Sequence, residues 1–140
     1  TITGTALEIF RRLKAARPAL QRTLQRAAQL MTRSAKANVR RVLNTTGEAK
    51  GNLARSITLD IDYAGLEAQV GPRRVVYAAI HEYGGVIRPV RAQALVFQVR
   101  GHWVTAQSVT IPARPYLHPA LEENQARITQ EFADSVEELL

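Results

Sequence analysis

An apolar stripe near the start of the chain constrains its fold more than any other feature. From position 20 to position 42, apolar residues recur at spacings of three and four, which is typical of a helix with one buried face. The stripe consists of Leu20, Leu24, Ala28, Met31, Ala35, Val39 and Val42. Pro18 suits the first position of this helix, and Asn44 and Gly47 suit its end. The pattern predicts a helix of about 25 residues, preceded by a shorter helix over residues 7–16.

Shorter patterns after this helix predict strands. Ile57, Leu59 and Ile61 alternate with polar residues, so they predict a half-buried strand that forms a hairpin with residues 66–70. Residues 76–83 read as one or two helical turns, and residues 86–90 as an extended segment. Residues 95–99 and 103–106 predict a second hairpin, with Gly101-His102 as its two-residue turn. Residues 109–111 predict one more extended segment.

A second apolar stripe near the chain end predicts a final helix that begins near Pro119. Its members are Leu121, Ile128, Phe132, Val136 and Leu139. The order of elements predicts an α+β fold, in which an antiparallel sheet is flanked by the long N-terminal helix and the C-terminal helix. A length of 140 residues fits one domain. Its expected parts are a helical region over 6–43, a sheet region over 56–111 and a last helix over 119–140.

Charge is distributed unevenly along the chain, whose net charge is +7. Residues 1–56 hold twelve Lys or Arg and two acidic residues, whereas residues 115–140 hold one Arg and six acidic residues. The basic face of the long helix consists of Arg22, Arg26, Arg33, Lys36 and Arg40. Such oppositely charged parts can attract each other within a chain or between chains, or the basic part can face a polyanion such as DNA.

The sequence offers few groups suited to catalysis, metal binding or membrane insertion. It has no cysteine, which excludes disulfides and thiolate metal sites. His81-Glu82 begins like a zinc-protease motif, but the second histidine would fall at position 85, which is Gly85. No nucleophile elbow, phosphate loop or apolar run of membrane-spanning length occurs. We therefore expect no enzyme, no metal, no cofactor and no membrane partner.

Two segments combine aromatic, Gly and Pro residues in a way that fixes backbone geometry. The first is Tyr77–Gly85, which reads YAAIHEYGG, and the second is Ile111–Leu121, which reads IPARPYLHPAL. A third segment, NLARSI over residues 52–57, follows Thr46-Gly47. In their order along the chain and in their spacing, residues 46–57, 77–85 and 109–117 resemble the phage virion morphogenesis and tail-completion family, specifically the Mu-like protein G group. The resemblance covers about residues 18–140, and it departs from the compact family pattern in the longer loop before residue 52.

The resemblance implies a small structural protein of the phage virion, placed at the head–tail junction in the neck or tail and assembled in the host cytoplasm. Related neck proteins form rings around the DNA channel. The implied partners are therefore further copies of the chain, other neck and tail proteins, and DNA in the channel. The alternative that the residues themselves leave open is a sequence-nonspecific DNA-binding module that uses the basic long helix.

Several residues are candidates for subunit or partner contact. Gly84 and Gly85 either end a short helix or form a turn that presents Tyr83 and the segment after it. Pro112 and Pro115 form either a stiff linker or, as the resemblance favours, a corner against which Arg114 and Tyr116 pack. Residues 86–106 are expected to project and make contacts, because one small sheet cannot bury their apolar content. The candidate contact residues are Tyr83, Val86, Ile87, Trp103, Glu131, Asp134 and Glu138.

Overall fold

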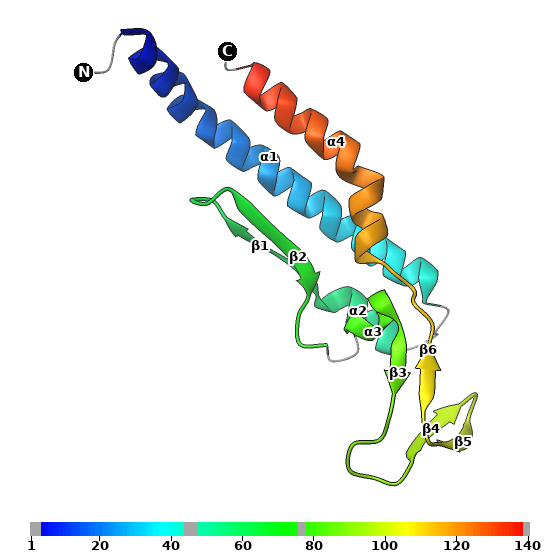
Figure 1. The fold of residues 1–140 in the computed structure, drawn as a ribbon. Helices are drawn as coiled ribbons and strands as arrows, with labels where there is room; N and C mark the ends of the chain where they lie inside the picture. The colour runs from blue at the N-terminus through cyan, green and yellow to red at the C-terminus, as the bar shows by residue number, and fades with distance from the viewer. Residues whose placement is uncertain (1–3, 44–47, 76–77, 139–140) are drawn as a thin grey trace.

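The computed structural model describes residues 4–43, 48–75 and 78–138 and has an α+β fold, as the sequence predicts (Figure 1). The helices within these ranges are α1 (Gly4–Val42), α2 (Glu48–Ser56), α3 (Ala78–Tyr83) and α4 (Leu117–Glu137). The strands are β1 (Ile57–Asp62), β2 (Glu67–Pro72), β3 (Gly85–Ile87), β4 (Leu95–Val99), β5 (His102–Ala106) and β6 (Val109–Ile111). They pair as three separate two-stranded antiparallel ribbons, β1–β2, β3–β6 and β4–β5.

The first helix is longer than the sequence predicts. The break expected before Pro18 is absent, and α1 runs without interruption over 39 residues. Proline in a helix interior removes one backbone hydrogen bond, which leaves the carbonyl of residue 14 without its amide donor. Both Lys14 and Pro18 are exposed, so water can supply that hydrogen bond and the helix continues. The predicted turn residues Asn44 and Gly47 lie outside the described residues.

The core lies where α1 is covered by α4 and by the segment from α2 to β1. Helix α4 runs back along α1 in the opposite direction, so that both chain ends lie at one end of the molecule (Figure 1). Small residues such as Ala35 and Ala120 are fully buried and permit a close approach of the helices. Around them are buried Val39, Leu43, Leu53, Ala54, Ile57, Ala78 and Tyr116. Of the predicted α1 stripe, Leu20, Leu24, Met31 and Val42 are half-buried.

Polar side chains set the register between the two long helices. The hydroxyls of Thr23 and Ser135 lie 2.6 Å apart and are buried. Further along, the Asn124 side-chain amide donates to the Ser34 hydroxyl at 2.9 Å. A buried hydrogen bond is lost if either partner shifts, and the unpaired group is then costly to keep away from water. These bonds therefore favour one alignment of α4 along α1.

The β1–β2 hairpin lies along the other side of α1 and is fixed at its turn (Figure 1). Gln21 donates to the carbonyl of Tyr63 at 2.9 Å, and Arg17 donates to the carbonyl of Ala64. At the opposite end Ile57, paired with Pro72, enters the core. The predicted hairpin is thus confirmed, with its second strand at Glu67–Pro72.

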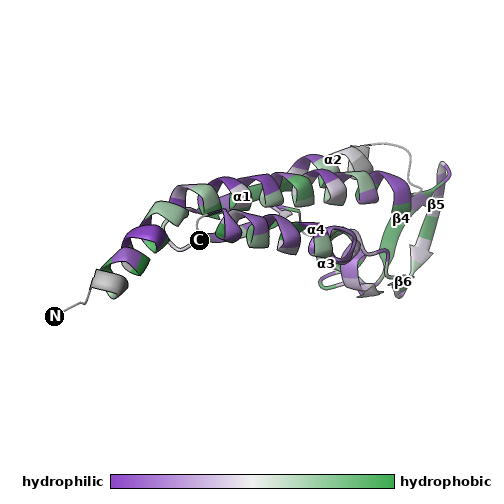
Figure 2. Cartoon of the chain, turned by 90° about the horizontal axis from the view of Figure 1, so that it is seen from above, coloured by the Kyte–Doolittle hydropathy of each residue, from purple (hydrophilic) through white to green (hydrophobic). Residues whose placement is uncertain are grey.

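Residues 85–111 form an arm that projects from one end of the helical body (Figures 1 and 2). The β3–β6 ribbon is its stem, and the β4–β5 hairpin is its tip. The turn of the tip is Arg100-Gly101, one residue earlier than the predicted Gly101-His102. Both turn residues have positive φ, +50° and +82°, as a type I′ turn requires. This requirement selects the dipeptide with Gly at its second position.

Candidate functional site: the α3–α4 junction and the surfaces around it

A buried carboxylate joins the two Gly- and Pro-rich segments. Glu82 in α3 is only 7% exposed, and its two oxygens accept hydrogen bonds from three successive backbone amides at the start of α4. Tyr116 and Leu117 donate to Oε2 at 2.9 and 3.0 Å, and His118 donates to Oε1 at 2.9 Å. The first amides of a helix have no partner within the helix, and a negative charge near them is stabilising. Glu82 therefore caps α4 from another element.

The entry to α4 explains why a remote cap is needed. Tyr116 occupies the position before the helix, and no side-chain hydrogen bond caps the amides locally. An aromatic residue has no acceptor that can reach them, unlike the Ser, Thr, Asp or Asn usually found there. The sequence interpretation considered His81-Glu82 only as part of a metal motif and missed this role. The signal was available, because α4 begins without a capping residue of its own.

Tyr116 stabilises the same junction from its buried side. It is the largest fully buried side chain among the described residues, and its hydroxyl donates to the carbonyl of Ala78 at 3.3 Å. Asn38 of α1 donates to the Tyr116 carbonyl at 3.2 Å. Burial, with the charge of Glu82 as the second cause and Tyr83 as the third, raises the pKa of Tyr116 to about 12. The phenol therefore stays neutral and keeps its hydroxyl as a donor.

Gly84 brings the backbones of the two segments together. Its φ is +70°, and its amide donates to the Ile80 carbonyl at 2.8 Å, which ends α3. A β-carbon at this position would lie 2.8 Å from the Ala113 nitrogen and 2.9 Å from the Ile111 oxygen. Next to it, the Arg114 amide donates to the His81 carbonyl at 2.8 Å. Gly84 thus both ends the helix and permits a close approach, so the junction holds both ends of the arm.

The predicted corner is formed by backbone contacts more than by side chains. Tyr116 packs into the core, whereas Pro112, Arg114 and Pro115 are exposed. The Arg114 side chain makes no hydrogen bond or ion pair to the residues described in the structure. Its charge acts on His81, whose pKa is lowered first by burial and second by Arg114.

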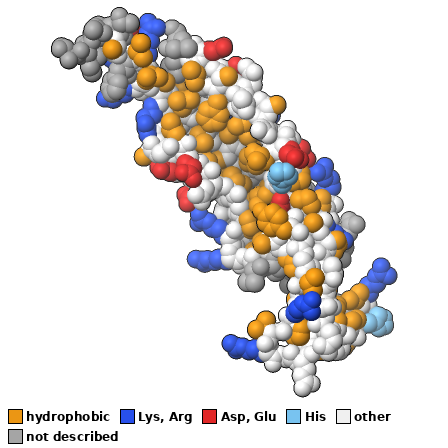
Figure 3. Space-filling model, viewed as in Figure 1, with side chains coloured by type: hydrophobic (Ala, Val, Ile, Leu, Met, Phe, Trp, Pro, Cys, Tyr) orange, Lys and Arg blue, Asp and Glu red, His pale blue; other side chains and the backbone are white. Residues whose placement is uncertain are grey.

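Beside this junction lies a shallow apolar depression. Its lining comes from four elements, with Met31 of α1, Val70 of β2, Tyr83 of α3, and Leu117 and Leu121 of α4. Tyr83 projects from its edge and is 81% exposed. In Figure 3 apolar side chains form a band along this face of the body, with acidic side chains on either side. Exposed aromatic and aliphatic groups gathered in this way are typical of protein contact surfaces.

The arm presents the remaining predicted apolar contact residues to solvent. Trp103 is 72% exposed, and Val86 and Ile87 in the stem are also exposed. On the tip hairpin, Val96 lies on the same face as Trp103 and is exposed as well. These residues thus belong to a different surface from the depression at the root of the arm.

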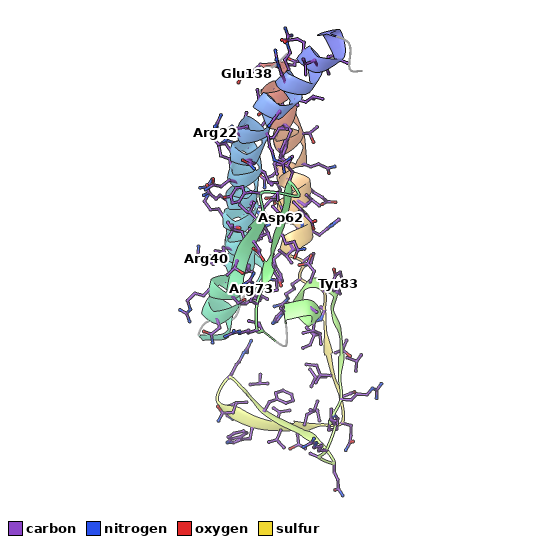
Figure 4. The ribbon with its side chains drawn as sticks, turned by 90° about the vertical axis from the view of Figure 1, so that its left-hand side faces the viewer. Arg22, Arg40, Asp62, Arg73, Tyr83 and Glu138 are labelled. Atoms are coloured by element: carbon purple, nitrogen blue, oxygen red, sulfur yellow. The ribbon has the colours of Figure 1, made fainter. Side chains whose placement is uncertain are left out.

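The basic face of α1 points away from α4 and from the hairpin. Arg22, Arg26, Arg33, Lys36 and Arg40 recur with helical spacing over about 27 Å of helix. Figure 4 shows Arg22 and Arg40 on the same side of α1. Arg26 donates to the Thr23 hydroxyl at 3.4 Å. None of the five forms an ion pair with a carboxylate in the described ranges.

The acidic helix therefore folds back on α1 without neutralising this basic face. The ion pair that the described residues form between the two helices is Arg41–Glu123 at 3.4 Å. Of the predicted acidic contact residues, Glu131 is half-buried and pairs with Arg127 of the same helix at 3.1 Å. Asp134 accepts from Gln130 at 2.7 Å, and both Asp134 and Glu138 are exposed. Both charged surfaces stay available to other molecules.

Among the described residues, no group of three or more His, Asp or Glu side chains is placed to hold a metal ion. The helices that the structure describes include none with the length and hydropathy of a membrane span.

His81 makes the junction sensitive to mild acid. Because folding lowers its pKa below the ordinary 6.5, the unfolded chain binds the proton more readily than the folded one. The stabilisation is thus present above pH 6.5 and is lost as the pH falls through the folded pKa. We expect the urea midpoint to fall from pH 7.5 to pH 5.5, and to fall less in His81→Gln. The matched control is His118→Gln, the same substitution at an exposed histidine. Equal slopes in all three proteins would contradict this assignment.

Comparison with known proteins identifies the family. The sequence profile of the phage virion morphogenesis family matches residues 25–140. This match covers most of the chain, and the chain therefore belongs to that family. The matched residues include α4, the α3–α4 junction, the arm and most of the basic face of α1. Searches of curated proteins and of solved structures gave no match.

Proposed function

We propose that this member of the phage virion morphogenesis family is a structural component of the head–tail junction, related to the Mu-like protein G group. Copies of the chain assemble head to tail into a ring around the DNA channel and complete the tail or connect it to the head. Its partners are other copies of itself and neighbouring neck or tail proteins. Its role is structural and does not involve catalysis.

The observation that carries the proposal is the exposed arm, held at both ends by the α3–α4 junction. A two-stranded ribbon is at best marginally stable alone in water, and this one exposes Trp103, Val96, Val86 and Ile87. Such a segment gains stability when a partner surface covers it, and a role in virion morphogenesis is one of assembly with other proteins. The junction fixes the direction in which the arm leaves the body.

The charged faces favour a head-to-tail arrangement. In a twofold contact centred on the basic face, that face would meet itself, and equal charges would repel. A head-to-tail contact places the basic face of α1 against the acidic outer surface of α4 in the next copy. Individual exposed ion pairs contribute only about 0–1 kcal/mol, so they orient the subunits more than they hold them.

Disruption of the gene in the phage that encodes it tests the proposed function. We expect filled heads and tails to accumulate separately in electron micrographs, and a plasmid copy of the wild-type gene to restore joined particles. Normal yields of joined, infectious particles from the disrupted phage would contradict the proposal.

A charge exchange tests the head-to-tail contact. Asp134→Lys with Glu138→Lys alters two exposed residues, so the melting temperature should stay within about 2–4 °C of wild type. We expect this variant to lose self-association in sedimentation at low salt. A second protein carrying Arg33→Glu and Arg40→Glu should associate with it when the two are mixed. Unchanged association of the first variant, or failure of the mixture to associate, would contradict the contact.

The second candidate function is sequence-nonspecific DNA binding by α1. It is favoured by the five basic residues of this face, four of them exposed, which have no described carboxylate partner. Such binding weakens steeply as salt rises, because bound cations displace counterions from the phosphates. If the free protein binds duplex DNA with this salt dependence, and Arg33→Glu with Arg40→Glu abolishes it while self-association persists, the second candidate replaces the first.

A further inference from the structure

We infer that the tip of the arm of one copy docks in the apolar depression of another copy. The contact joins the β4–β5 face that carries Val96 and Trp103 to the surface formed by Met31, Val70, Tyr83 and Leu121. It rests on the proposed function only in assuming that copies of the chain assemble, and it assigns the two surfaces that meet.

The tip needs a partner on the face that it shows to solvent. In the β4–β5 register, Leu95, Phe97, Val104 and Ala106 share one face and are half-buried. The opposite face holds Val96 and Trp103, paired across the strands with Thr105 and Gln98. Trp103 is 72% exposed, and a tryptophan in this position is the residue type most enriched at the energetic centre of interfaces.

The depression offers a complementary surface. Glu82 also lines it, and the Glu82 carboxylate is occupied by the three amides at the start of α4. Its rim exposes Tyr83 at 81% and Leu121 at 47%. One exposed aromatic residue beside aliphatic side chains suits an indole ring, which combines a large apolar area with one hydrogen-bond donor. The Glu82 carboxylate is thus structural, and the apolar side chains make the contact.

Charge favours a second copy as the occupant. Residues 85–111 carry Arg88, Arg91 and Arg100 and no acidic residue. Next to the depression, the exposed Glu122 lies on α4, and its carboxylate is 3.1 Å from Nε2 of His118, which lines the depression. Figure 3 shows acidic side chains on either side of the apolar band. Opposite charges at the edge of an apolar contact speed encounter and disfavour wrong partners.

The arrangement is asymmetric and therefore compatible with a closed ring. Each copy provides an arm tip to one neighbour and a depression to the other, so the contact is heterologous. The arm projects away from its own body, and the depression lies beside the root of the arm. Docking between different copies therefore requires no movement of the arm or of the depression within a copy.

Trp103 is the only tryptophan of the chain, so its fluorescence reports the contact directly. We expect its emission maximum to shift to shorter wavelength as the concentration of the purified protein rises, in parallel with sedimentation. Leu121→Arg should weaken association about tenfold or more, with an unchanged melting temperature. The matched control is Leu13→Arg, the same substitution at a site that is 63% exposed on α1, and it should associate like wild type.

Cysteine cross-linking tests the pairing without depending on that variant. The chain lacks cysteine, so a Val96→Cys protein mixed with a Leu121→Cys protein can form a disulfide only between copies. We expect the mixed dimer to form rapidly, whereas Val96→Cys with Gln29→Cys, on the basic face of α1, should not. Absence of the mixed dimer, or a Leu121→Cys dimer forming just as fast alone, overturns the proposal.

Two fluorescence results also overturn it. Short-wavelength emission that is independent of concentration means that the arm folds onto its own body. Emission that stays at long wavelength in sedimenting oligomers means that assembly uses other surfaces. Either result leaves the expected separation of heads and tails in the disrupted phage unaffected, so failure of this contact is distinguishable from failure of the proposed function.

Discussion

Replacing Glu82 with Leu is expected to lower the free energy of unfolding by about 3–5 kcal/mol. The substitution leaves three backbone amides at the start of α4 without an acceptor, in a place that water does not reach freely. It also removes the negative charge that the positive end of the helix dipole attracts. Urea unfolding followed by circular dichroism measures the loss. Because α4 begins at this point, we also expect its first turns to lose hydrogen-exchange protection.

Glu82→Gln separates the contribution of the carboxylate charge from that of the side chain's shape. An amide keeps one acceptor oxygen, but its NH₂ group then faces a backbone donor, so we expect an intermediate loss of about 1–3 kcal/mol. The matched control is Glu122→Gln, an exposed residue on the same helix, which should stay within about 0.5 kcal/mol of wild type. A loss no larger in Glu82→Leu than in the Glu122 variant would show that the cap contributes nothing.

Gly84→Ala is expected to cost about 2–5 kcal/mol, through two separate effects. An L-residue at φ +70° is strained by about 1–2 kcal/mol, and its β-carbon would meet backbone atoms of Ile111 and Ala113 at 2.8–2.9 Å. Backbone cannot rotate away as a side chain can, so the arm stem would have to move. Thermal or urea unfolding measures the stability, and sedimentation tests whether association is lost with it.

Gly101→Ala is the control that isolates the cost of backbone strain at positive φ. Gly101 also has a positive φ of +82°, but a β-carbon there would meet no described residue within 4 Å beyond its chain neighbours. It should therefore show the conformational cost alone, about 1–2 kcal/mol. Equal losses in the two variants would mean that close approach at Gly84 contributes nothing to the junction.

Local patterns predicted the elements of this fold well. The α1 stripe, both predicted hairpins and the final helix follow from apolar spacing, because burial imposes that period on any sequence. The boundaries were less accurate where two rules competed. Pro18 suits a helix start, but an exposed proline is also tolerated inside a long helix that tertiary packing supports.

The functional surfaces depend on contacts that no local pattern encodes. Glu82 and the amides that it caps are more than thirty positions apart, and the sequence of either segment alone does not reveal the pairing. The projection of residues 86–106 was predicted from their apolar content, but which face of the β4–β5 hairpin meets solvent is a tertiary property, because the same alternation of residues occurs in strands that a core covers. Gly84 was recognised as a turn residue, whereas its close approach to residues 111–113 needed the structure.

Electron cryomicroscopy of the head–tail junction, in virions of the phage that encodes this chain, tests the central claim most directly. We predict a closed ring of copies of this chain around the DNA, with α1 and α4 of each copy resolved and each arm tip seated on the neighbouring copy. A junction whose density is fully explained by other proteins, in virions that lack this chain, would contradict it.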